Sequence, residues 1–502
     1  MNTEKKQIVI LGGGTAGWIA ANLMAVHWKD KFDITLVESP NIGTIGVGEG
    51  STPPLRGFFS AIGVPESEWM NECQATYKVG ITFKDWSVKS GFDHYFHPFL
   101  SQPDEFSAPA FFHNSFLRRK GIDLEGHPDH FFLATELAKQ KLAPIAPPNF
   151  PFEINYGYHF DSGLLGKFLA KKAATKGVKH QLATVQDVTF DNQGNIKTLV
   201  TDNGEHIAAD LFFDCTGFRG QLIQKALKVP YHSCAKSLFN DSAVVFATEQ
   251  TGEPESQTIS TALKYGWAWN IPLQNRIGNG YVFSSSFCDE DKAETEFREH
   301  LGLLDADTEA RHIKFQVGRV EQHWAKNCLA IGLSQGFIEP LEATALDMVQ
   351  ETVVRFIEAY NQGEGTDKFR QDFNNRINAR FDAIRDYIVC HYRISSRTDT
   401  DYWIANGNNQ HISRSLHAIL ASWMAGNNIT DELERQKLDA YFPNVSWNCL
   451  LTGKGIYPDP SQLKPGNDMA HKYKIEQLQR YIKGCALNFK SHSEQLKLLT
   501  TS

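Results

Sequence analysis

The spacing of hydrophobic residues near the start of the chain predicts a β-α-β unit. An apolar run at 7–11 is typical of a buried parallel strand. Apolar residues at helical spacing follow at 18–26, and a second strand pattern covers 33–38. Together the three segments have the length of one such unit, about 30 residues. We therefore expect a parallel sheet of the Rossmann type at the N-terminus.

The middle of the chain is predicted to be rich in strands. Alternating apolar and polar residues over 76–83 indicate a strand, and turn residues within 184–210 indicate a β-meander. Strand patterns also dominate 240–320. Two more apolar runs, 211–217 and 329–333, are typical of buried strands.

Further helices are expected after the β-α-β unit, including a charged helix near 291–300. Residues 160–172 form a helical pattern, which follows a stretch of loops and short helices at 86–160. From residue 344 onward the spacing of apolar residues is helical for most of the remaining chain. We expect a loop at 464–468 and a frayed tail at 491–502.

Composition excludes several classes of protein. The chain has 502 residues, of which 41% are hydrophobic and 22% charged, so we expect a folded globular protein rather than a disordered one. The net charge of -8 argues against a nucleic-acid-binding protein, which would carry a basic surface. Aromatic residues make up 12%, which suits either an aromatic-lined pocket or a large core.

The eight cysteines are scattered, and no two of them form a C-x-x-C pair. Neither a zinc site nor a disulfide framework is predicted, and this usage suits a reducing cytosol. His94-x-x-His97 and His127-x-x-His130 lack a third ligand at a usable spacing, so we expect no metal. No run reaches the roughly 18 apolar residues of a membrane span. The prediction is a soluble cytoplasmic protein that binds neither membrane nor nucleic acid.

The motif Gly12-x-Gly14-x-x-Gly17 follows the first strand and opens the first helix. Such glycines let a pyrophosphate approach the backbone, and the start of the helix faces its negative charge. Glu38, at the end of the second strand, can bind a ribose hydroxyl. A glycine turn without a ligand is the alternative. A second strand-end turn, from Asp214 to Gly217, favours FAD over a nicotinamide cofactor alone.

Two other patterns have simpler alternatives. The glycine-rich segment 46–50 can lie against a flat ring, although a plain surface loop has the same composition. Trp267 and Trp269 would face the same side of one strand, which ends at Pro272. Taken alone, a tryptophan pair of this kind is more typical of a core.

Taken together, these segments resemble the flavin-dependent halogenases of the tryptophan halogenase family. The resemblance extends from the N-terminus to about residue 405, and more loosely beyond it. Its most specific part is Trp267-x-Trp269-x-Ile271-Pro272. The other matching segments are 12–18, 45–49, 214–220 and 332–342.

The resemblance implies the α/β fold of the flavin monooxygenases. A Rossmann-type FAD domain would carry an inserted mixed β-sheet as the substrate domain, with a mainly helical C-terminal region. The body would span 1–345, with the inserted sheet at about 86–160 and 221–320. The region 346–502 would cap the substrate site.

The resemblance also implies the chemistry. FADH2 from a separate flavin reductase would react with O2 and halide to give hypohalous acid. Lys78 would hold this acid, or the haloamine made from it, beside an indole-like or other electron-rich aromatic ring. Burial among apolar neighbours would lower the pKa of Lys78, whereas spacing alone suggests an exposed lysine at a strand end. Trp267 and Trp269 would line the tunnel between flavin and substrate.

Glu342 would orient the hypohalous acid or accept the ring proton, although a carboxylate at the start of a helix is also stabilised by the helix dipole. The halide would lie on the backbone amides of Thr344 and Ala345. The family usually has glycine at position 345. Because the added methyl group restricts the backbone, we expect a wider site that prefers bromide to chloride.

The residues implied to contact FAD belong to the strand-end turns and nearby segments. They are Gly12, Gly14, Thr15, Ala16, Gly17, Glu38, Gly46, Val47, Gly48, Glu49, Val185, Asp214, Gly217, Leu333 and Leu346.

His97 and Phe99 match the residues that sandwich the substrate ring, and Tyr441 or Phe442 would replace a late tryptophan. The segment that holds the amino-acid group looks shortened at about 425–445, so free tryptophan is not the expected substrate. The expected partners are a flavin reductase and a small aromatic molecule, and the chain would be a monomer or homodimer. A single-component NAD(P)H-dependent aromatic hydroxylase and a non-catalytic flavin-binding subunit are the alternatives.

Overall fold

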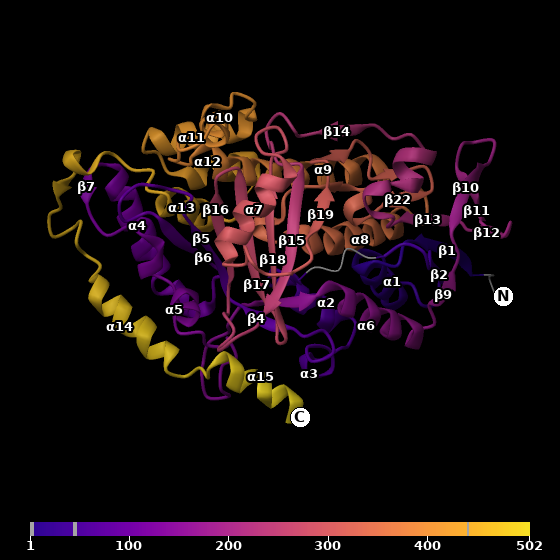
Figure 1. Ribbon diagram of the computed structural model, residues 1–502, viewed down its shortest axis with the longest axis horizontal. Coiled ribbons are helices and arrows are strands. Elements are labelled where there is room, and N and C mark those ends of the chain that lie inside the picture. The colour runs from indigo at the N-terminus through magenta and orange to yellow at the C-terminus, as the bar shows by residue number, and fades with distance from the viewer. Residues whose placement is uncertain (1–4, 44–47, 439–440, 502) are drawn as a thin grey trace. The chain divides into compact units, whose positions relative to one another are not determined.

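The computed structural model describes residues 5–43, 48–438 and 441–501 (Figure 1). The chain forms two compact units, each made of three separate stretches. Unit 1 contains Met1–Ala75, Phe160–Cys234 and Phe315–Phe381, and unit 2 contains Thr76–His159, Ala235–Lys314 and Asp382–Ser502.

A six-stranded sheet forms the centre of unit 1. Its order is β21-β22-β13-β1-β2-β9, and every neighbouring pair is parallel except β21 and β22. The central strands are buried on both faces, which explains their continuous apolar sequences. The strands are β1 (Lys6–Leu11), β2 (Phe32–Glu38), β9 (Lys179–Leu182), β13 (Leu211–Asp214), β21 (Trp324–Ala325) and β22 (Cys328–Ala330).

Different layers cover the two faces of this sheet. Phe212 of β13 shares a core with Leu199 of a three-stranded meander, whereas the next residue, Phe213, contacts Phe356 of α8. Helix α1 packs against both α6 and α8. The meander consists of β10 (Val185–Phe190), β11 (Ile196–Thr201) and β12 (His206–Ala208), and the helices are α1 (Thr15–His27), α6 (Ser162–Thr175) and α8 (Ala345–Gln362).

Shorter elements complete unit 1. They are β3 (Gly48–Gly50), α2 (Pro54–Ala61), α3 (Glu66–Trp69) and a small sheet of β14 (Tyr231–Ser233), β20 (Gly318–Val320) and β23 (Gly336–Phe337). Helix α9 (Arg370–Arg393) begins in unit 1 and ends in unit 2.

A seven-stranded sheet, of order β19-β15-β18-β17-β16-β5-β6, forms the centre of unit 2. Its pairs are antiparallel apart from β16 with β5. Helix α7 packs Phe297 against Phe246 and Tyr281 of the sheet. These elements are β5 (Gly80–Lys84), β6 (His94–Pro98), β15 (Ser242–Glu249), β16 (Thr258–Leu263), β17 (Gly266–Pro272), β18 (Arg276–Phe283), α7 (Glu290–Leu301) and β19 (Arg311–Lys314).

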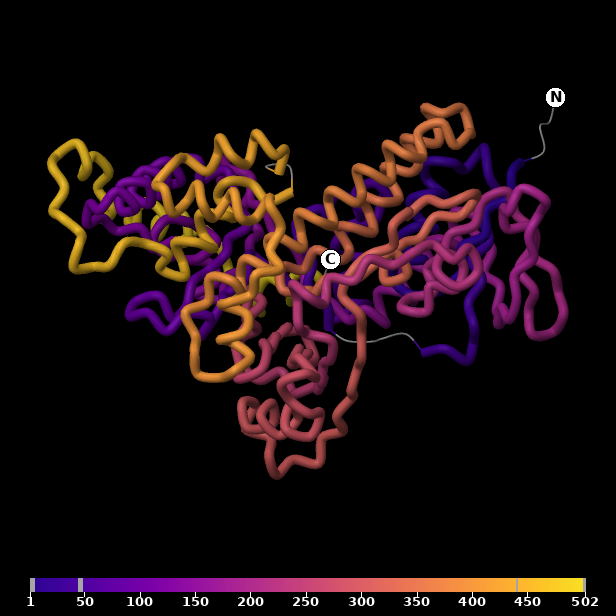
Figure 2. Tube along the Cα trace, turned by 90° about the horizontal axis from the view of Figure 1, so that it is seen from above, coloured from indigo at the N-terminus to yellow at the C-terminus, as the bar shows by residue number. Residues whose placement is uncertain are grey.

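Helices α13 and α14 of unit 2 lie beside segments from residues 102–140, shown yellow against purple in Figure 2. Val445 and Cys449 of α13 share a core with Phe111 and Phe131, and Tyr481 of α14 contacts Phe106. The helices are α4 (Ala108–Arg119), α5 (Leu133–Lys139), α10 (Asp401–Asn408), α11 (Arg414–Met424), α12 (Ile429–Gln436), α13 (Asn444–Gly453), α14 (Ile475–Ala486) and α15 (His492–Thr501). Short strands are β4 (Thr76–Lys78), β7 (Ile122–Asp123), β8 (Gly157–Asp161) and β24 (Lys464–Pro465).

The predicted α/β class, the β-α-β start, the meander and the helical C-terminal region are confirmed. The single strand predicted at 76–83 is wrong, because the chain changes partners at Val79: β4 pairs with β8, and β5 pairs with β6 and β16. The loop predicted at 464–468 contains β24.

The frayed tail predicted at 491–502 is also wrong. Helix α15 covers His492–Thr501, and its His492 is fully buried. The segment is polar, so apolar spacing could not reveal it. Hydrogen bonds of His492 and Ser493 anchor the start of the helix, and the Leu496 side chain is buried.

Candidate active site

The three glycines of the β1–α1 turn, all in unit 1, have different surroundings. Gly12 has a φ of 118°, and a Cβ there would overlap the carbonyl oxygen of Cys215. A Cβ at Gly17 would overlap the carbonyl oxygen of Gly12, so helix and strand touch at this point. Gly14, by contrast, has no described atom within 4 Å of where its Cβ would be. Open space above Gly14 at the start of α1 fits a pyrophosphate group.

Glu38 ends β2 directly beside this turn. Its carboxylate lies so close to Gly13 that any side chain there would overlap it. His180 Nε2 lies 3.0 Å from Glu38 Oε2, and the His180 ring contacts Trp18 of α1. These contacts hold Glu38 beside the glycine turn, where the ribose next to a bound pyrophosphate would lie. His180 had no recognisable signal in the sequence.

Glu49 has an unusual environment for a carboxyl group. Burial raises the pKa of Glu49 to about 7, a hydrogen bond with Ser162 acts in the opposite direction, and the charge of Asp161 raises it further. Its neighbour Gly48 is buried at the start of β3. Gly46 and Val47, which were also predicted to contact FAD, lie outside the described residues.

Asp214 shapes the second strand-end turn from inside. Its carboxylate accepts hydrogen bonds from the backbone and hydroxyl of Thr216 and from the backbone amides of Leu222 and Ile223. This fully buried group thus holds the turn rather than reaching out of it. Gly217 follows with a φ of 65°, a conformation that glycine adopts without strain.

Three other predicted FAD contacts lie near these turns. The segment of Gly332 and Leu333 lies close to the first turn, because a side chain at Gly332 would crowd Ala16 of α1. Thr15 donates its hydroxyl to the Ser162 carbonyl. Val185 begins β10, its side chain lies in the meander core, and its carbonyl accepts a hydrogen bond from Gln221.

Glu342 is buried at the end of a short 3-10 turn, Pro340–Glu342, directly before α8. Ala343 then has a φ of 54°, in the left-handed region that a non-glycine residue rarely adopts. Thr344 precedes α8, and its side chain accepts no capping hydrogen bond from a described residue. The first backbone amides of α8 thus face a position suited to an anion. Leu346, the second residue of this helix, is buried.

The structure changes the interpretation of Ala345. This residue starts α8 in a helical conformation, for which alanine is the most favourable residue. The methyl group therefore does not force the backbone open, as the sequence argument supposed. The strained residue is Ala343, two positions earlier.

Lys78 is fully buried at the end of β4 in unit 2. Its Nζ lies 5.5 Å from the centre of the Phe99 ring, so two residues predicted to serve the substrate are close together. The residues on both sides of Lys78 are tied to other segments: Tyr77 N–H donates to His492 Nε2, and Val79 N–H donates to the Ser256 carbonyl.

A buried hydrogen-bond chain connects the Lys78 strand with β17. The Thr76 hydroxyl donates to the carbonyl of Pro272 at 2.7 Å, so it accepts from His159 Nδ1 at 3.2 Å. The Nε2 atom of His159 then accepts from the Thr258 hydroxyl at 2.8 Å. Burial, together with the charge of Lys78, lowers the pKa of His159 well below its usual value. His159 is thus neutral, and one tautomer is fixed by its neighbours.

Trp267 and Trp269 lie on β17 with ring centres 5.9 Å apart. Trp267 is buried, whereas Trp269 is partly exposed. Trp269 is paired across the sheet with Gly280 of β18, and its ring occupies the space where a Gly280 side chain would be.

Aromatic side chains gather around the other predicted substrate residues of unit 2. His97 Nε2 lies 2.9 Å from the Ser446 hydroxyl, and its ring faces Tyr387 at 6.2 Å. Phe442 stacks on Tyr387 with centres 3.8 Å apart, while Tyr441 beside it is less buried. Tyr387, which helical spacing alone did not distinguish from a core residue, therefore links His97 with Phe442.

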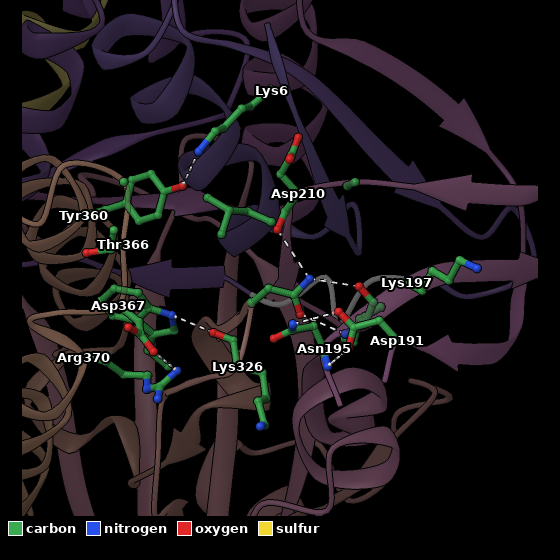
Figure 3. A pocket seen from close by; sticks show the side chains of 16 residues that line it. Lys6, Asp191, Asn195, Lys197, Asp210, Lys326, Tyr360, Thr366, Asp367 and Arg370 are labelled. Atoms are coloured by element: carbon green, nitrogen blue, oxygen red, sulfur yellow. Dashed lines mark hydrogen bonds and ion pairs between the residues drawn. The ribbon is translucent and has the colours of Figure 1, made fainter. Parts of the chain in front are cut away.

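A pocket of about 500 Å³ opens elsewhere in unit 1. Lys6 begins β1, and Asp210 and Asn327 precede β13 and β22, so this pocket lies at the amino ends of the parallel strands. Cofactors of such sheets bind at the carboxyl ends. In Figure 3, Lys6 points toward the hydroxyl of Tyr360, at 3.5 Å. The pocket is separate from the glycine turn.

Within the described part of the chain, no three His, Cys, Asp or Glu side chains gather as metal ligands. Over the same residues, no helix has both the length and the apolar character needed to cross a bilayer.

The glycine turn, Glu38 and the second strand-end turn are typical of dinucleotide-binding α/β proteins, the class that includes the flavin-dependent oxidoreductases. The tryptophan halogenase family model matches residues 7–470. Tryptophan 6-halogenase SttH of Streptomyces toxytricini is 37% identical over 80% of this chain and 81% of its own. Tryptophan 7-halogenase RebH of Lentzea aerocolonigenes is 34% identical over 94% and 93%.

Solved structures agree with the sequence relatives. The crystal structure of SttH has a TM-score of 0.85, with 32% identity, 98% of this chain and 99% of that chain covered. Xcc4156, a flavin-dependent halogenase from Xanthomonas campestris, has a TM-score of 0.83, with 30% identity and 99% of both chains covered. The chain belongs to the tryptophan halogenase family, and it is a flavin-dependent halogenase that acts on an aromatic substrate.

Proposed function

We propose that this enzyme halogenates an indole-like or other electron-rich aromatic ring, that Lys78 delivers the halogen, and that bromide is preferred over chloride. The observation that carries the proposal is the position of Lys78, fully buried against Phe99 in the unit that also holds Trp267 and Trp269.

The residues of unit 1 fit FAD. Open space above Gly14 would receive the pyrophosphate, Glu38 would bind the ribose, and the Gly217 and Leu333 turns would border the rest of the cofactor. When bound, reduced FAD supplies the electrons by which O2 and halide become hypohalous acid: FADH2 + O2 + X⁻ + H⁺ gives FAD + HOX + H2O. A separate flavin reductase supplies the FADH2.

Lys78 then acts at the substrate end. Its amine holds HOX by a hydrogen bond, or forms the haloamine and releases one water. An electron-rich ring takes the halogen, loses a proton and regenerates the amine. Phe99 beside Nζ supplies an apolar surface for that ring and excludes water.

Glu342 is the group that we assign to the proton. It is a buried carboxyl in the 3-10 turn Pro340–Glu342, shortly before the amides of Thr344 and Ala345 that are proposed to hold the halide. As a carboxylate it would orient the hypohalous acid, or relay the proton lost by the ring to the nitrogen or oxygen that gave up the halogen.

The preference for bromide is argued from the anion itself. Bromide is larger than chloride, costs less to dehydrate and is easier to oxidise. The amides of Thr344 and Ala345 would bind either anion. Nearby Asp347 would oppose an anion, but it forms an ion pair with Arg380, which reduces that repulsion.

The substrate is proposed to be small and flat. SttH and RebH are tryptophan halogenases by name. In this chain His97, Phe99 and the stacked Tyr387–Phe442 pair supply aromatic faces, and they suit indole without requiring an amino-acid group.

The test supplies FADH2, O2, bromide or chloride, and a panel of indoles, and follows products by mass spectrometry. Lys78→Ala should abolish the halogenated product while flavin oxidation continues. Lys84→Ala, at an exposed lysine on β5, is the matched control and should behave like wild type. More than a tenth of wild-type product from Lys78→Ala, a loss below about 1.4 kcal/mol, would contradict the role of Lys78.

The purified protein also distinguishes a halogenase from the alternative function, a single-component NAD(P)H-dependent aromatic hydroxylase. A halogenase that takes FADH2 from a partner should purify with little FAD and should not oxidise NADPH by itself. Yellow protein that consumes NADPH without a reductase would favour the hydroxylase.

A further inference from the structure

The strand that carries Lys78 is very short. Strand β4 has three residues and pairs with β8 through Thr76 with His159 and Lys78 with Gly157. Its central residue, Tyr77, points its backbone N–H at the side chain of His492, and the distance to Nε2 is 2.9 Å. His492 lies 415 residues farther along the chain, at the first position of α15.

The hydrogen bonds define the state of His492. A backbone N–H can only donate, so Nε2 must carry a lone pair. Nδ1 lies 3.1 Å from the carbonyl oxygen of Pro254, so Nδ1 carries the hydrogen. His492 is therefore a neutral imidazole in one tautomer, fully buried between two backbone groups.

The start of α15 is also held by its own backbone. His492 N–H donates to the Lys141 carbonyl at 2.9 Å, and Ser493 N–H donates to the Glu253 carboxylate. Lys141 in turn forms an ion pair with Glu255 at 2.8 Å. The imidazole is thus fixed in place relative to residues 253–255.

The two residues that flank Lys78 are anchored to the same loop. On one side Tyr77 is joined through His492 to Pro254, and on the other Val79 N–H donates to the Ser256 carbonyl at 2.8 Å. Lys78 is held between these two attachments. Removal of one attachment would let the strand end rotate and would change the direction of the lysine side chain.

We infer that His492 is a positioning residue for halogen transfer, because it fixes the backbone on one side of Lys78. The inference rests on the proposed role of Lys78. The C-terminal helix would then contribute to the reaction through this one hydrogen bond, without touching substrate or cofactor.

Two amide substitutions separate the two contacts of His492. His492→Asn places an N–H near the position of Nδ1 and keeps the bond to Pro254, but its side chain is too short to accept from Tyr77. His492→Gln places a carbonyl oxygen near the position of Nε2 and keeps the acceptor for Tyr77, but it loses the bond to Pro254.

The readout is the halogenated product formed per flavin oxidised, with the hypohalous acid that escapes captured by a diketone scavenger. His492→Asn should lower this ratio at least tenfold while flavin oxidation stays within twofold of wild type and more hypohalous acid reaches the scavenger. His492→Gln should keep the ratio within threefold. Thermal unfolding of both variants measures any general loss of structure.

Other results would overturn the inference. If His492 acts only as a structural anchor through its bond to Pro254, His492→Gln, which loses that bond, should be the more damaging variant. The product ratio of His492→Asn, which keeps the bond, should then be unchanged. Equal losses in both variants, accompanied by slower flavin oxidation, would also contradict it. Lys78→Ala tests the proposed role of Lys78 separately, because halogenation retained in that variant would refute it. If Lys78→Ala loses halogenation while His492→Asn behaves like wild type, only the role of His492 is refuted.

Discussion

The indole of Trp269 lies over Gly280, its partner across β17 and β18, and leaves no room there for a side chain. Glycine within a strand often marks such a close approach. In this sheet it allows a bulky ring to lie against the neighbouring strand. The glycine thereby determines the orientation of one of the paired tryptophans.

Gly280→Ala should therefore displace Trp269. We expect the halogenated product per flavin oxidised to fall about tenfold, equivalent to about 1.4 kcal/mol, with more escaped hypohalous acid. Gly407→Ala is the control, because Gly407 lies in α10 and no described atom is within 4 Å of its Cβ position. An unchanged product ratio in Gly280→Ala would show that the ring orientation is unimportant.

Thr76→Val should break the connection between the Lys78 strand and Pro272. The substitution keeps the shape of the side chain but leaves the Pro272 carbonyl and His159 Nδ1 without their partner. Loss of buried hydrogen bonds of this kind costs about 1–3 kcal/mol. Chemical denaturation should show this loss, and Thr76→Ser, which keeps the hydroxyl, should recover most of it. Equal stability of the two variants would argue against the chain of bonds.

The stability of the protein should depend on the protonation of His492. Burial lowers the pKa of His492 to about 4 despite the opposing effects of Glu253 and Glu255, whereas the unfolded chain has a pKa near 6.5. Between these values the unfolded state binds more protons, so the contribution of His492 is complete above pH 6.5 and is lost as pH falls toward 4. The loss is about 3 kcal/mol.

Thermal unfolding of wild type and His492→Gln between pH 4.5 and 7 measures this contribution. The variant has no titrating group at position 492, so its Tm should fall less steeply on acidification. Parallel curves for the two proteins would assign the acid sensitivity to other groups.

Halide selectivity provides a prediction for the start of α8. With equal concentrations of chloride and bromide, brominated product should be in excess. Since Ala345 is helical, Ala345→Gly should leave the product ratio unchanged and lower stability by about 1 kcal/mol. Excess chlorinated product would refute the preference for bromide, and a changed ratio in Ala345→Gly would restore a role for the methyl group.

Local patterns were sufficient for much of the fold. The apolar run before Gly12 and the turn residues between 184 and 210 predicted β1 and the meander, because each depends on neighbouring residues. The break at Val79 could not be predicted, since it arises from a change of strand partner far away in the sequence. The alternation of apolar and polar residues also could not reveal the burial of Lys78, because both faces of its strand are buried.

In the candidate site, too, local motifs could be predicted from the sequence and contacts between distant segments could not. Gly12, Gly14 and Gly17 are recognisable because a single turn needs them together. His159, Tyr387 and His492 are not, since each becomes important only through contacts with distant segments. His492 in particular lay in a polar stretch that resembled a tail.

The bond between Tyr77 and His492 also has a consequence for how the enzyme is made. Strand β4 is synthesised first, and the group that accepts the Tyr77 N–H follows 415 residues later. A nascent chain, or a product truncated before residue 492, lacks that acceptor. If His492 positions Lys78 as inferred, transfer of the halogen by Lys78 becomes efficient only after residue 492 has been translated and has folded into place.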